Sequence, residues 1–548
     1  MSLNSGTVLS SDPDWWRGAV IYQIYPRSFA DTNQDGTGDL PGITERLDYV
    51  ASLGVDAIWI SPVFVSPMDD FGYDVSDHCD IDPLFGSLAD FDALVERAHQ
   101  LGLRVMIDLV LSHTSDRHVW FKESRADRSN PKSDWYVWAD PKPDGTPPNN
   151  WLSIFGGSAW EWDTSREQYY LHNFLISQPD LNFHNDDVRA EILKIVRFWL
   201  DRNVDGFRLD TANFYYHDKE LRDNPPAARE ARVTSVKKAN PYAWQFHEFD
   251  KTRPENLGFL AAFRALLDEY DSRTSVGELG LDENVAQVMS DYTKRDVRLH
   301  MAYSFSLFFD NLSAAAIQNV VEEMDNAVGD GWPAYAMSNH DVARVVSRYG
   351  VQDQAELAGP LLVALLTCLR GSICLYQGEE LSLEESDVPF EQLQDPYGIR
   401  FWPAFKGRDG CRTPMPWSNE QQHAGFSTVS PWLPMDENHA QRAVDVQERE
   451  SGSSLHQNRA FLNWRRSETR LQKGAIRFLE AEEPVLMFER GDAEDALICT
   501  FNLSADAVTI PLPKPIYQLD VPGPQGGSVD GKTMRLPGYS LVFGTYKP

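Results

Sequence analysis

Cysteine is scarce in this sequence, and the few cysteines form no framework. The 548 residues include only five of them, Cys79, Cys368, Cys374, Cys411 and Cys499. Their number is odd and no two stand in a CxxC pair, so the pattern favours neither a disulfide scaffold nor a zinc site. Because free thiols are typical of a reducing compartment, we expect a cytoplasmic protein.

Long hydrophobic runs and positive charge are also lacking. The longest apolar run, PLLVALLTCL (360–369), is about half a membrane span and is followed by Arg370. The N-terminal residues show neither the basic flank nor the apolar core of a signal sequence. Lys and Arg number 50 against 82 Asp and Glu, a net charge of −32. This charge repels nucleic acids and anionic lipids, so we expect neither a nucleic acid nor a membrane as partner.

What the sequence does contain is a regular alternation of short apolar runs with helical patterns. The clearest helix is capped by Ser87, has Asp90 in its capping box and ends at Gly102. Eight strands that alternate with helices predict an α/β protein with a (β/α)8 barrel, the TIM barrel. The runs predicted as strands are AVIYQIYP (19–26), AIWIS (57–61), RVMIDLV (104–110), GFRLD (206–210), TSVGE (274–278), HMAYSF (300–305), PAYAMSNHD (333–341) and SICLYQG (372–378).

Uneven spacing between these strands predicts further domains. Val110 and Asp210 are 100 residues apart, too far for one crossover helix, so we expect an inserted subdomain after the third strand. A helix in LHQNRAFLNWRRSETRL (455–471) would close the barrel, and the short runs PVLMFER, ALICTFNLS, AVTIPL and SLVFGTY predict a β-sandwich. The predicted domains are 1–111 (barrel, first part), 112–182 (inserted subdomain B), 183–472 (barrel, second part, with an insertion after strand eight at about 379–450) and 473–548 (C-terminal all-β sandwich).

Acids, histidines and one arginine stand at the predicted strand ends, where the active sites of such barrels lie. Carboxylates around one point suit glycoside hydrolysis, in which one acid attacks the sugar and another protonates the leaving oxygen. A metal site is the competing use, and the fixed positive charge of Arg208 argues against it. Arg208 would keep Asp210 ionised, while an apolar setting would raise the pKa of Glu278. The strand-end residues are Asp108, His113, Arg208, Asp210, Glu278, His340 and Asp341.

Four ordered signatures carry a family resemblance. DLVLSH (108–113), GFRLDTANF (206–214), VGE (276–278) and SNHD (338–341) resemble those of α-glucosidases in the α-amylase superfamily (glycoside hydrolase family 13). A fifth, QPDLN (178–182), stands just before the fourth strand, as in the oligo-1,6-glucosidase and maltase branch. The resemblance covers nearly the whole chain. It implies a retaining exo-α-glucosidase that forms a covalent glucosyl-enzyme and releases glucose from the non-reducing end of short α-glucosides.

The catalytic roles of that family fall on three acids of this sequence. The resemblance implies that Asp210 is the nucleophile and that Glu278 is the general acid and then the base. Asp341 would hold the glucose 2- and 3-hydroxyls and help to distort the ring. His113 and His340 would donate hydrogen bonds that strengthen as positive charge develops on the sugar.

The resemblance also implies a set of substrate-binding residues. Tyr73 would stack on the glucose face, and Asp74 and Arg412 would pair at the floor of the pocket. Thr211 directly follows the nucleophile, and Thr at this position accompanies α-1,4 preference in the branch, whereas Val accompanies α-1,6 preference. The full substrate-binding set is Tyr73, Asp74, His113, Gln178, Arg208, Thr211, His340, Arg344 and Arg412.

The loop DTNQDGTGD (31–39) starts like a calcium-binding EF-hand loop. Its twelfth position is Gly42 instead of the bidentate Glu, and a strand pattern precedes it in place of a helix. In the branch that the sequence resembles, this loop binds a structural divalent cation, Ca²⁺ or Mg²⁺. Ser112 replaces an Asn that binds a second calcium in many superfamily members, which argues against that second site. The implied ligands are Asp31, Asn33, Asp35, Thr37 (through its carbonyl) and Asp39.

Several functional alternatives stay open at this point. A covalent intermediate implies transglucosylation when another alcohol replaces water. An isomerase of sucrose or trehalose would use the same acids, although the RLDR-type loop of sucrose isomerases is absent from the sequence. A non-catalytic relative, like the transporter heavy chains, would have a membrane helix and would have lost catalytic acids that this sequence keeps. We expect small-molecule α-glucosides as partners and no organic cofactor; the sequence does not give the oligomeric state.

Overall fold

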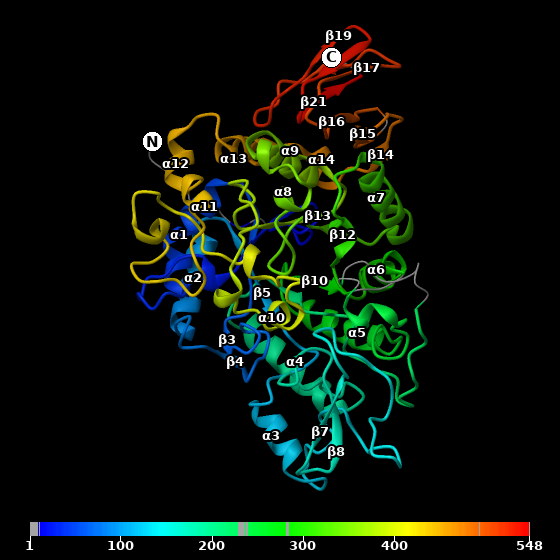
Figure 1. The fold of residues 1–548 in the computed structure, drawn as a ribbon. Coiled ribbons are helices and arrows are strands. Elements are labelled where there is room, and N and C mark those ends of the chain that lie inside the picture. The colour runs from blue at the N-terminus through cyan, green and yellow to red at the C-terminus, as the bar shows by residue number, and fades with distance from the viewer. Residues whose placement is uncertain are drawn as a thin grey trace.

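The computed structural model describes residues 9, 11–227, 236, 239–280, 284–492 and 494–546. At its centre lie eight parallel strands: β1 (Val20–Ile24), β2 (Ala57–Ile60), β5 (Arg104–Leu109), β9 (Gly206–Leu209), β10 (Thr274–Leu279), β11 (Met301–Ser304), β12 (Pro333–Tyr335) and β13 (Ser372–Tyr376). They close into a barrel in the order β1-β13-β12-β11-β10-β9-β5-β2 (Figure 1). Each strand falls within one of the eight predicted runs or extends it by one residue, so the TIM barrel and the α/β class are confirmed.

Every residue of these eight strands is buried, because side chains fill the barrel on one face and helices cover the other. This explains why most of the strands read as mainly apolar runs without polar alternation. The predicted capping box at the start of α2 is present, with Ser87 and Asp90 each accepting from the other's backbone N–H. The helices between the strands are α1 (Leu40–Ser52), α2 (Leu88–Gln100), α4 (Asp186–Leu200), α5 (Asn256–Leu267), α6 (Val285–Thr293), α7 (Ala314–Val328), α8 (Val345–Arg348) and α9 (Ala355–Cys368).

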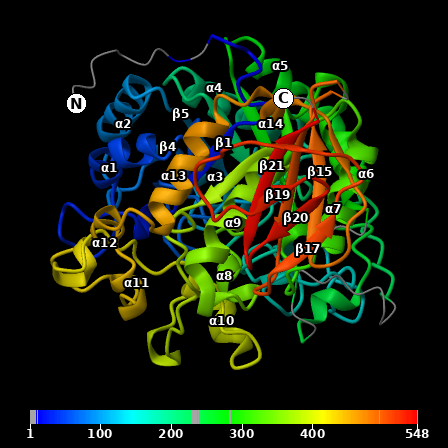
Figure 2. The ribbon, with the colours of Figure 1, turned by 90° about the horizontal axis from the view of Figure 1, so that it is seen from above.

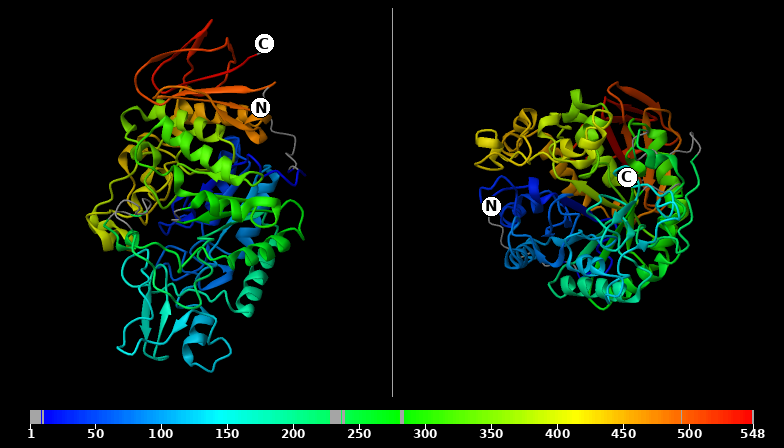
Figure 3. Two further views of the ribbon diagram at one scale, coloured as in Figure 1. Left: turned by 90° about the vertical axis from the view of Figure 1, so that its right-hand side faces the viewer. Right: turned by 60° about the horizontal axis from the view of Figure 1, so that its bottom comes forward.

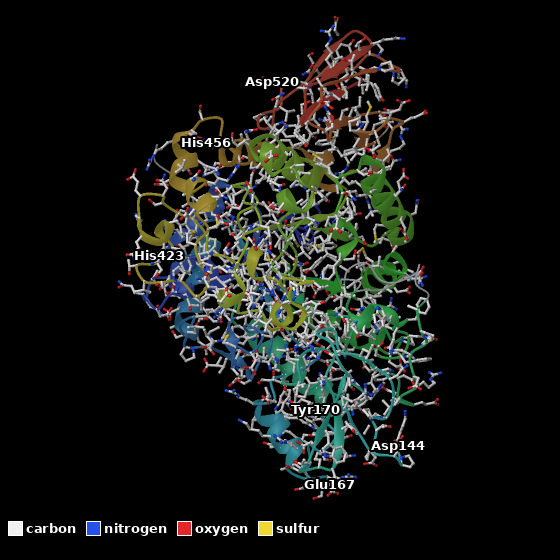
Figure 4. The ribbon with its side chains drawn as sticks, viewed as in Figure 1. Asp144, Glu167, Tyr170, His423, His456 and Asp520 are labelled. Carbon is white, nitrogen blue, oxygen red and sulfur yellow. The ribbon has the colours of Figure 1, made fainter. Side chains whose placement is uncertain are left out.

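Between β5 and β9 the chain leaves the barrel and forms a separate layer. It contains α3 (Val119–Ala126) and a sheet of β6 (Trp138–Ala139), β8 (Gln168–Leu171) and β7 (Trp160–Asp163), in that order. Figure 3 shows this cyan segment at the end of the molecule opposite the red C-terminal strands, and Figure 4 places Tyr170, Glu167 and Asp144 there. A short hairpin of β3 (Phe64–Val65) and β4 (Asp77–Ile81) precedes it.

After β13 the chain runs through a long irregular segment. It carries α10 (Pro396–Phe401), α11 (Glu437–Gln441) and α12 (Val444–Arg449) before the barrel is closed. The single closing helix predicted over residues 455–471 is wrong in detail, because α13 (Ser454–Arg465) and α14 (Thr469–Lys473) are separate helices. The carboxylate of Glu468 accepts from the N–H of Arg470 and starts the second helix anew.

The C-terminal residues form two antiparallel sheets, as predicted for this region. One contains β14 (Ile476–Phe478), β15 (Val485–Arg490), β16 (Leu497–Asn502), β21 (Ser540–Thr545) and β18 (Tyr517–Gln518). The other contains β17 (Val508–Pro511), β20 (Thr533–Leu536) and β19 (Ser528–Asp530). Seen from above in Figure 2, these strands lie over α9, whose residues contact β16 and β21. The C-terminal all-β region is therefore confirmed.

The seventh strand is shorter than predicted. The seventh strand was predicted over residues 333–341 but ends at Tyr335, because the chain then turns and the N–H of Asp341 bonds to Asn339 Oδ1. Residues 1–8 and 10, part of the N-terminal stretch 1–18 on which the expectation about a signal sequence rests, lie outside the described residues. Within the described ranges, no helix has the length and apolarity needed to cross a membrane.

Candidate active site

A cavity of about 890 Å³ lies at the C-terminal end of the barrel strands. Asp210, Glu278 and Asp341 all line it, although up to 131 positions separate them along the chain. Tyr73, His113 and Thr211 also face the cavity, while apolar and aromatic side chains form much of the remaining wall. The remaining wall includes Ile154, Phe155, Phe174, Phe214, Phe305, Phe308, Phe309, Tyr397 and Phe405.

Arg208 holds the acids of this site together from behind. Its Nη1 lies 2.7 Å from Asp108 Oδ1 and 2.7 Å from Asp210 Oδ1, and its Nη2 lies 2.6 Å from Glu278 Oε2. The side chain is fully buried. Burial acts against its charge, but Asp108 and Glu278 outweigh this and raise the pKa of Arg208. The site therefore contains a fixed cation.

Glu278 is set to carry a proton at neutral pH. Burial raises the pKa of Glu278 to about 8; Arg208 opposes the rise, and the nearby Asp210 and Asp341 add to it. Asp210, in contrast, accepts a hydrogen bond from Arg208 at one oxygen and from Thr211 Oγ1 at the other. The two carboxyl groups thus differ in environment.

Thr211 connects these two acids through a strained backbone. Its N–H donates to Glu278 Oε2 at 3.1 Å and its Oγ1 donates to Asp210 Oδ2 at 3.1 Å. Its φ angle is +39°, a conformation that β-branched residues rarely adopt. Strain of this kind persists where surrounding bonds fix the residue, and it is common at functional sites.

Asp341 is held as an anion by two arginines. Its Oδ1 lies 2.9 Å from Arg412 Nη2 and 3.2 Å from Arg408 Nη1. Burial acts against ionisation, but Arg408 and Arg412 together hold the pKa of Asp341 well below its usual range. Because burial lowers the pKa of His340 to about 3, that ring is neutral and the two guanidinium groups supply the charge.

His340 lies behind the cavity wall and supports Tyr73. The two rings are stacked with their centroids 5.3 Å apart, and His340 Nε2 lies 2.6 Å from Tyr73 Oη. Gln23 Nε2 contacts the other ring nitrogen at 2.7 Å. Tyr73 Oη also donates to Asp108 Oδ2 at 3.1 Å. His340 therefore orients the aromatic face that Tyr73 presents to the cavity, and in this structure both its nitrogens have protein partners.

Asp74 and Arg412 were predicted to pair at the floor of the pocket, and the prediction is wrong for Asp74. Asp74 is fully buried, and its carboxylate accepts hydrogen bonds from Ser66 Oγ and from the N–H groups of Asp69 and Asp70. It organises its own loop instead of facing the cavity. Asp70 lines the cavity in its place.

Asp70 is bound by Arg408, a residue that sequence reasoning missed. Arg408 Nη2 lies 2.8 Å from Asp70 Oδ1 and 2.8 Å from Asp395 Oδ1, while its Nη1 reaches Asp341. One buried arginine thus joins three acids at the floor. The available signals were DDFGYD, in which Asp70 precedes Tyr73 by three positions, and GRDGCR, in which Arg408 precedes Arg412 by four.

Two other predicted substrate contacts are replaced by protein contacts. Arg344 is buried, and its guanidinium donates to the carbonyl oxygens of Gln377 and Cys411, so its prediction as a substrate-binding residue is wrong. Arg348, one turn further along, lines the cavity. Gln178 is also fully buried; its amide donates to Asp70 Oδ2 at 3.1 Å and therefore orients the cavity wall from behind.

The predicted metal loop is closed by its own hydrogen bonds. Asp31 accepts from the N–H groups of Gln34 and Gly36, and Asp39 caps α1 by accepting from Gly42. Within the described part of the chain, no three or more His, Cys, Asp or Glu side chains group together in a way that could hold a metal ion. The donors proposed from sequence are hard oxygens, which suit Ca²⁺ or Mg²⁺. Metal binding here stays a prediction.

Comparison with known sequences adds independent information. The model of the alpha-amylase catalytic domain matches residues 23–474. A protein named probable alpha-glucosidase from Rhizobium meliloti (strain 1021) is 55% identical over 548 residues, covering 99% of each chain. An oligo-1,6-glucosidase from Heyndrickxia coagulans is 35% identical, covering 92% of this chain and 95% of its own.

Solved structures of related enzymes also superpose on nearly the whole chain. The alpha-glucosyl transfer enzyme XgtA superposes with a TM-score of 0.95 at 57% identity, covering 97% of this chain and 99% of that one. The trehalulose synthase MutB from Pseudomonas mesoacidophila MX-45 superposes with a TM-score of 0.88 at 30% identity, with the same coverage.

Proposed function

Since the chain belongs to the alpha-amylase family of glycoside hydrolases and is an α-glucosidase by its relatives, we propose that Asp210, Glu278 and Asp341 carry out its reaction with retention of configuration. The observation that supports this most directly is the single guanidinium of Arg208, which contacts Asp210 and Glu278 at 2.7 and 2.6 Å. It holds the anion and the proton donor on one side of the cavity.

The proposed reaction has two steps. In the first, Asp210 Oδ2 bonds to the anomeric carbon while Glu278 gives its proton to the glycosidic oxygen and the leaving alcohol departs. In the second, Glu278 takes a proton from water, and the water oxygen displaces Asp210 to release glucose. Oδ2 is the attacking oxygen because Oδ1 is held by the charged Arg208, whereas Oδ2 accepts from the neutral hydroxyl of Thr211. Arg208 also disperses the charge of both acids during the exchange of roles.

We further propose that the floor around Asp70 and Arg408 limits the enzyme to exo-action. Asp341 and Asp70 share the guanidinium of Arg408 and present carboxylate oxygens suited to the hydroxyls of one terminal glucose. A closed floor leaves no room for further sugar units beyond that glucose. Short α-glucosides are the substrates that fit this arrangement, and a cytoplasmic location stays our expectation from the cysteine pattern.

Product analysis tests the exo-α-glucosidase proposal. With maltose, isomaltose, sucrose and trehalose as separate substrates, we expect glucose as the common product by chromatography. With soluble starch we expect glucose alone at early times. Early release of maltotriose or longer products would contradict a closed floor.

Transfer to other alcohols is the second candidate activity. It is favoured by one observation: apolar and aromatic side chains form much of the cavity wall, and such a surface contacts an organic alcohol while offering water few hydrogen-bond partners. Two structural neighbours, XgtA and MutB, are named as a glucosyl transfer enzyme and a trehalulose synthase. In the same assay, isomeric disaccharides formed from sucrose would identify the isomerase alternative.

Thr211 is proposed to bias the enzyme toward α-1,4 linkages. Its oxygen lines the cavity beside Asp210 and can accept a hydrogen bond from the leaving sugar, which a Val methyl cannot. One contact of this kind is worth about 1–3 kcal/mol, or roughly ten- to a hundredfold in specificity. We expect a higher kcat/KM for maltose than for isomaltose, and a shift toward isomaltose in Thr211→Val. Thr211→Ser, which keeps the hydroxyl, is the control. An unchanged ratio of kcat/KM for maltose to kcat/KM for isomaltose in Thr211→Val would refute the role.

The loop 31–39 is proposed to bind Ca²⁺ or Mg²⁺ for stability. Asp31 and Asp39 fix the turn that leads into α1, away from the cavity residues. A chelator is therefore expected to lower the melting temperature and to leave kcat of the folded enzyme unchanged, with Asp31→Asn abolishing the response. The measurement is thermal unfolding with and without added calcium or magnesium; equal melting temperatures in both would rule the site out.

A further inference from the structure

A row of hydrogen-bonded side chains runs from His113 to Asp210. Ser112 Oγ lies 2.9 Å from His113 Nδ1 and 3.1 Å from Thr211 Oγ1, and Thr211 Oγ1 lies 3.1 Å from Asp210 Oδ2. All four residues are at most 9% exposed, so bulk water does not replace these partners. Ser112 follows β5 and Thr211 follows β9, so only the folded barrel brings the two hydroxyls together.

The position of each proton in this row follows from the contacts of His113. Its Nε2 lies 2.8 Å from the backbone carbonyl of Tyr73 and, further away at 3.2 Å, near the amide nitrogen of Gln178, which has Asp70 Oδ2 and the Tyr73 carbonyl as acceptors. Because a carbonyl only accepts, the shorter contact places the hydrogen on Nε2. Burial lowers the pKa of His113, so the ring is neutral and Nδ1 is an acceptor. The Ser112 hydroxyl must then donate to Nδ1. Toward Thr211 the Ser112 oxygen then presents lone pairs and no hydrogen, so it can only accept a hydrogen bond from Thr211.

Thr211 therefore has one hydroxyl hydrogen and two acceptors at the same distance. In the resting enzyme the carboxylate of Asp210 is the stronger acceptor, because a charged oxygen forms the stronger hydrogen bond. Asp210 Oδ2 loses that charge when it bonds to the sugar. At that stage the neutral oxygen of Ser112 becomes the better partner for Thr211.

We propose that Ser112 is a positioning residue of the first chemical step, because it accepts the Thr211 hydrogen bond as Asp210 Oδ2 bonds to the anomeric carbon. The Thr211 O–H bond stays intact and only its acceptor changes. Ser112 then stabilises the transition state and the glucosyl-enzyme more than the free enzyme, which is the condition for raising the rate. This inference rests on the proposed function, since it needs Asp210 to be the nucleophile.

The backbone of Thr211 fits this role. Its φ of +39° is costly for a β-branched residue, and its N–H is fixed by Glu278 Oε2 at 3.1 Å. With the amide fixed, only rotation about the Cβ–Oγ1 bond of Thr211 is needed to redirect the hydroxyl hydrogen. The change of acceptor thus requires no movement of heavy atoms.

A double-mutant cycle on an aryl α-glucoside tests the proposal, because such a substrate removes any effect of the leaving sugar. Ser112→Ala is expected to lower kcat/KM roughly three- to tenfold, the range of one neutral hydrogen bond. The amount of glucosyl-enzyme trapped by rapid quenching should fall with it. In a Thr211→Val background the same Ser112→Ala change should have no further effect, whereas in the Thr211→Ser control, which keeps the hydroxyl, it should persist.

Two results would overturn the proposal: a wild-type kcat/KM in Ser112→Ala, or an undiminished loss in the Thr211→Val background, which would indicate a structural role. If Ser112→Ala unfolds below the assay temperature, Ser112→Cys replaces it in the test. Cys nearly keeps the volume of Ser but is a weak acceptor, so Ser112→Cys should show the same loss of kcat/KM as expected for Ser112→Ala. Asp210→Asn distinguishes a failure of the proposed function from a failure of the proposed role of Ser112. If it stays active, the proposed function fails; if it is inactive while Ser112→Ala is unaffected, only the role of Ser112 fails.

Discussion

Replacing Asp210 with Asn is expected to lower kcat/KM for 4-nitrophenyl α-glucoside by at least about three orders of magnitude. The amide keeps the shape of the side chain but removes the charge that attacks the anomeric carbon. Arg208 keeps its contacts with Asp108 and Glu278, so the fold should persist. Steady-state kinetics, with a thermal melt to confirm folding, measures the effect, and more than about a tenth of wild-type activity would contradict the assignment.

Chemical rescue supplies the matched control. Asp210→Ala leaves a space at the position of the attacking oxygen, beside Thr211, and azide can enter it and attack the sugar from the same face. The expected product is β-glucosyl azide, identified by its NMR coupling constant, with nitrophenolate as the leaving group. Failure of azide to restore turnover in a folded variant would place the nucleophile elsewhere.

Replacing Glu278 with Gln should have an effect that depends on the leaving group. Maltose needs a proton on its departing oxygen, so its kcat/KM should fall roughly 10²- to 10⁴-fold. For α-glucosyl fluoride, which departs more easily, kcat/KM should fall less than about tenfold. Because Glu278 also activates the water of the second step, glucosyl-enzyme should accumulate. Equal losses on both substrates would show that Glu278 is not the acid.

The pH dependence gives the same residue a second test. The acid must be protonated to act, so kcat/KM for maltose should be maintained at neutral pH and fall as pH rises through the pKa of Glu278, about 8. Arg208 opposes this raised value, and burial outweighs it. In Glu278→Gln the alkaline decline should disappear from the residual activity. An unchanged decline would assign it to another group.

Much of the site was predictable because strand ends carry it. Asp210 directly follows β9 and Glu278 is the penultimate residue of β10, and both strands lie within runs that were predicted from the sequence. Parallel strands of a barrel bring their carboxyl ends to one rim, so a correct strand prediction also predicts which acids meet. Asp341 was found by its motif, although the strand before it ends six residues earlier.

The errors fall where loops choose between neighbouring residues of like chemistry. DDFGYD offers Asp69, Asp70 and Asp74 within six positions, and one of them reaches the cavity. The same ambiguity separates Arg408 from Arg412, whereas Arg344 and Arg348 lie one turn apart at the two ends of the short helix α8. A loop has no fixed side-chain period, so its sequence does not state which way each residue points.

The sequence by itself determined the barrel, its order of strands and helices, and the chemical class of the residues at its rim. These depend on burial periodicity and motifs, which are local properties of the chain. Only the tertiary structure decided the protonation states and the hydrogen-bond directions of the site. These are the raised pKa of Glu278, the charge on Asp341, and the hydrogen-bonded row from His113 through Ser112 to Thr211. Each depends on burial and on partners more than 60 positions away in the sequence, such as Arg208 for Glu278. Because desolvation and charge act through space, no pattern along the chain records them.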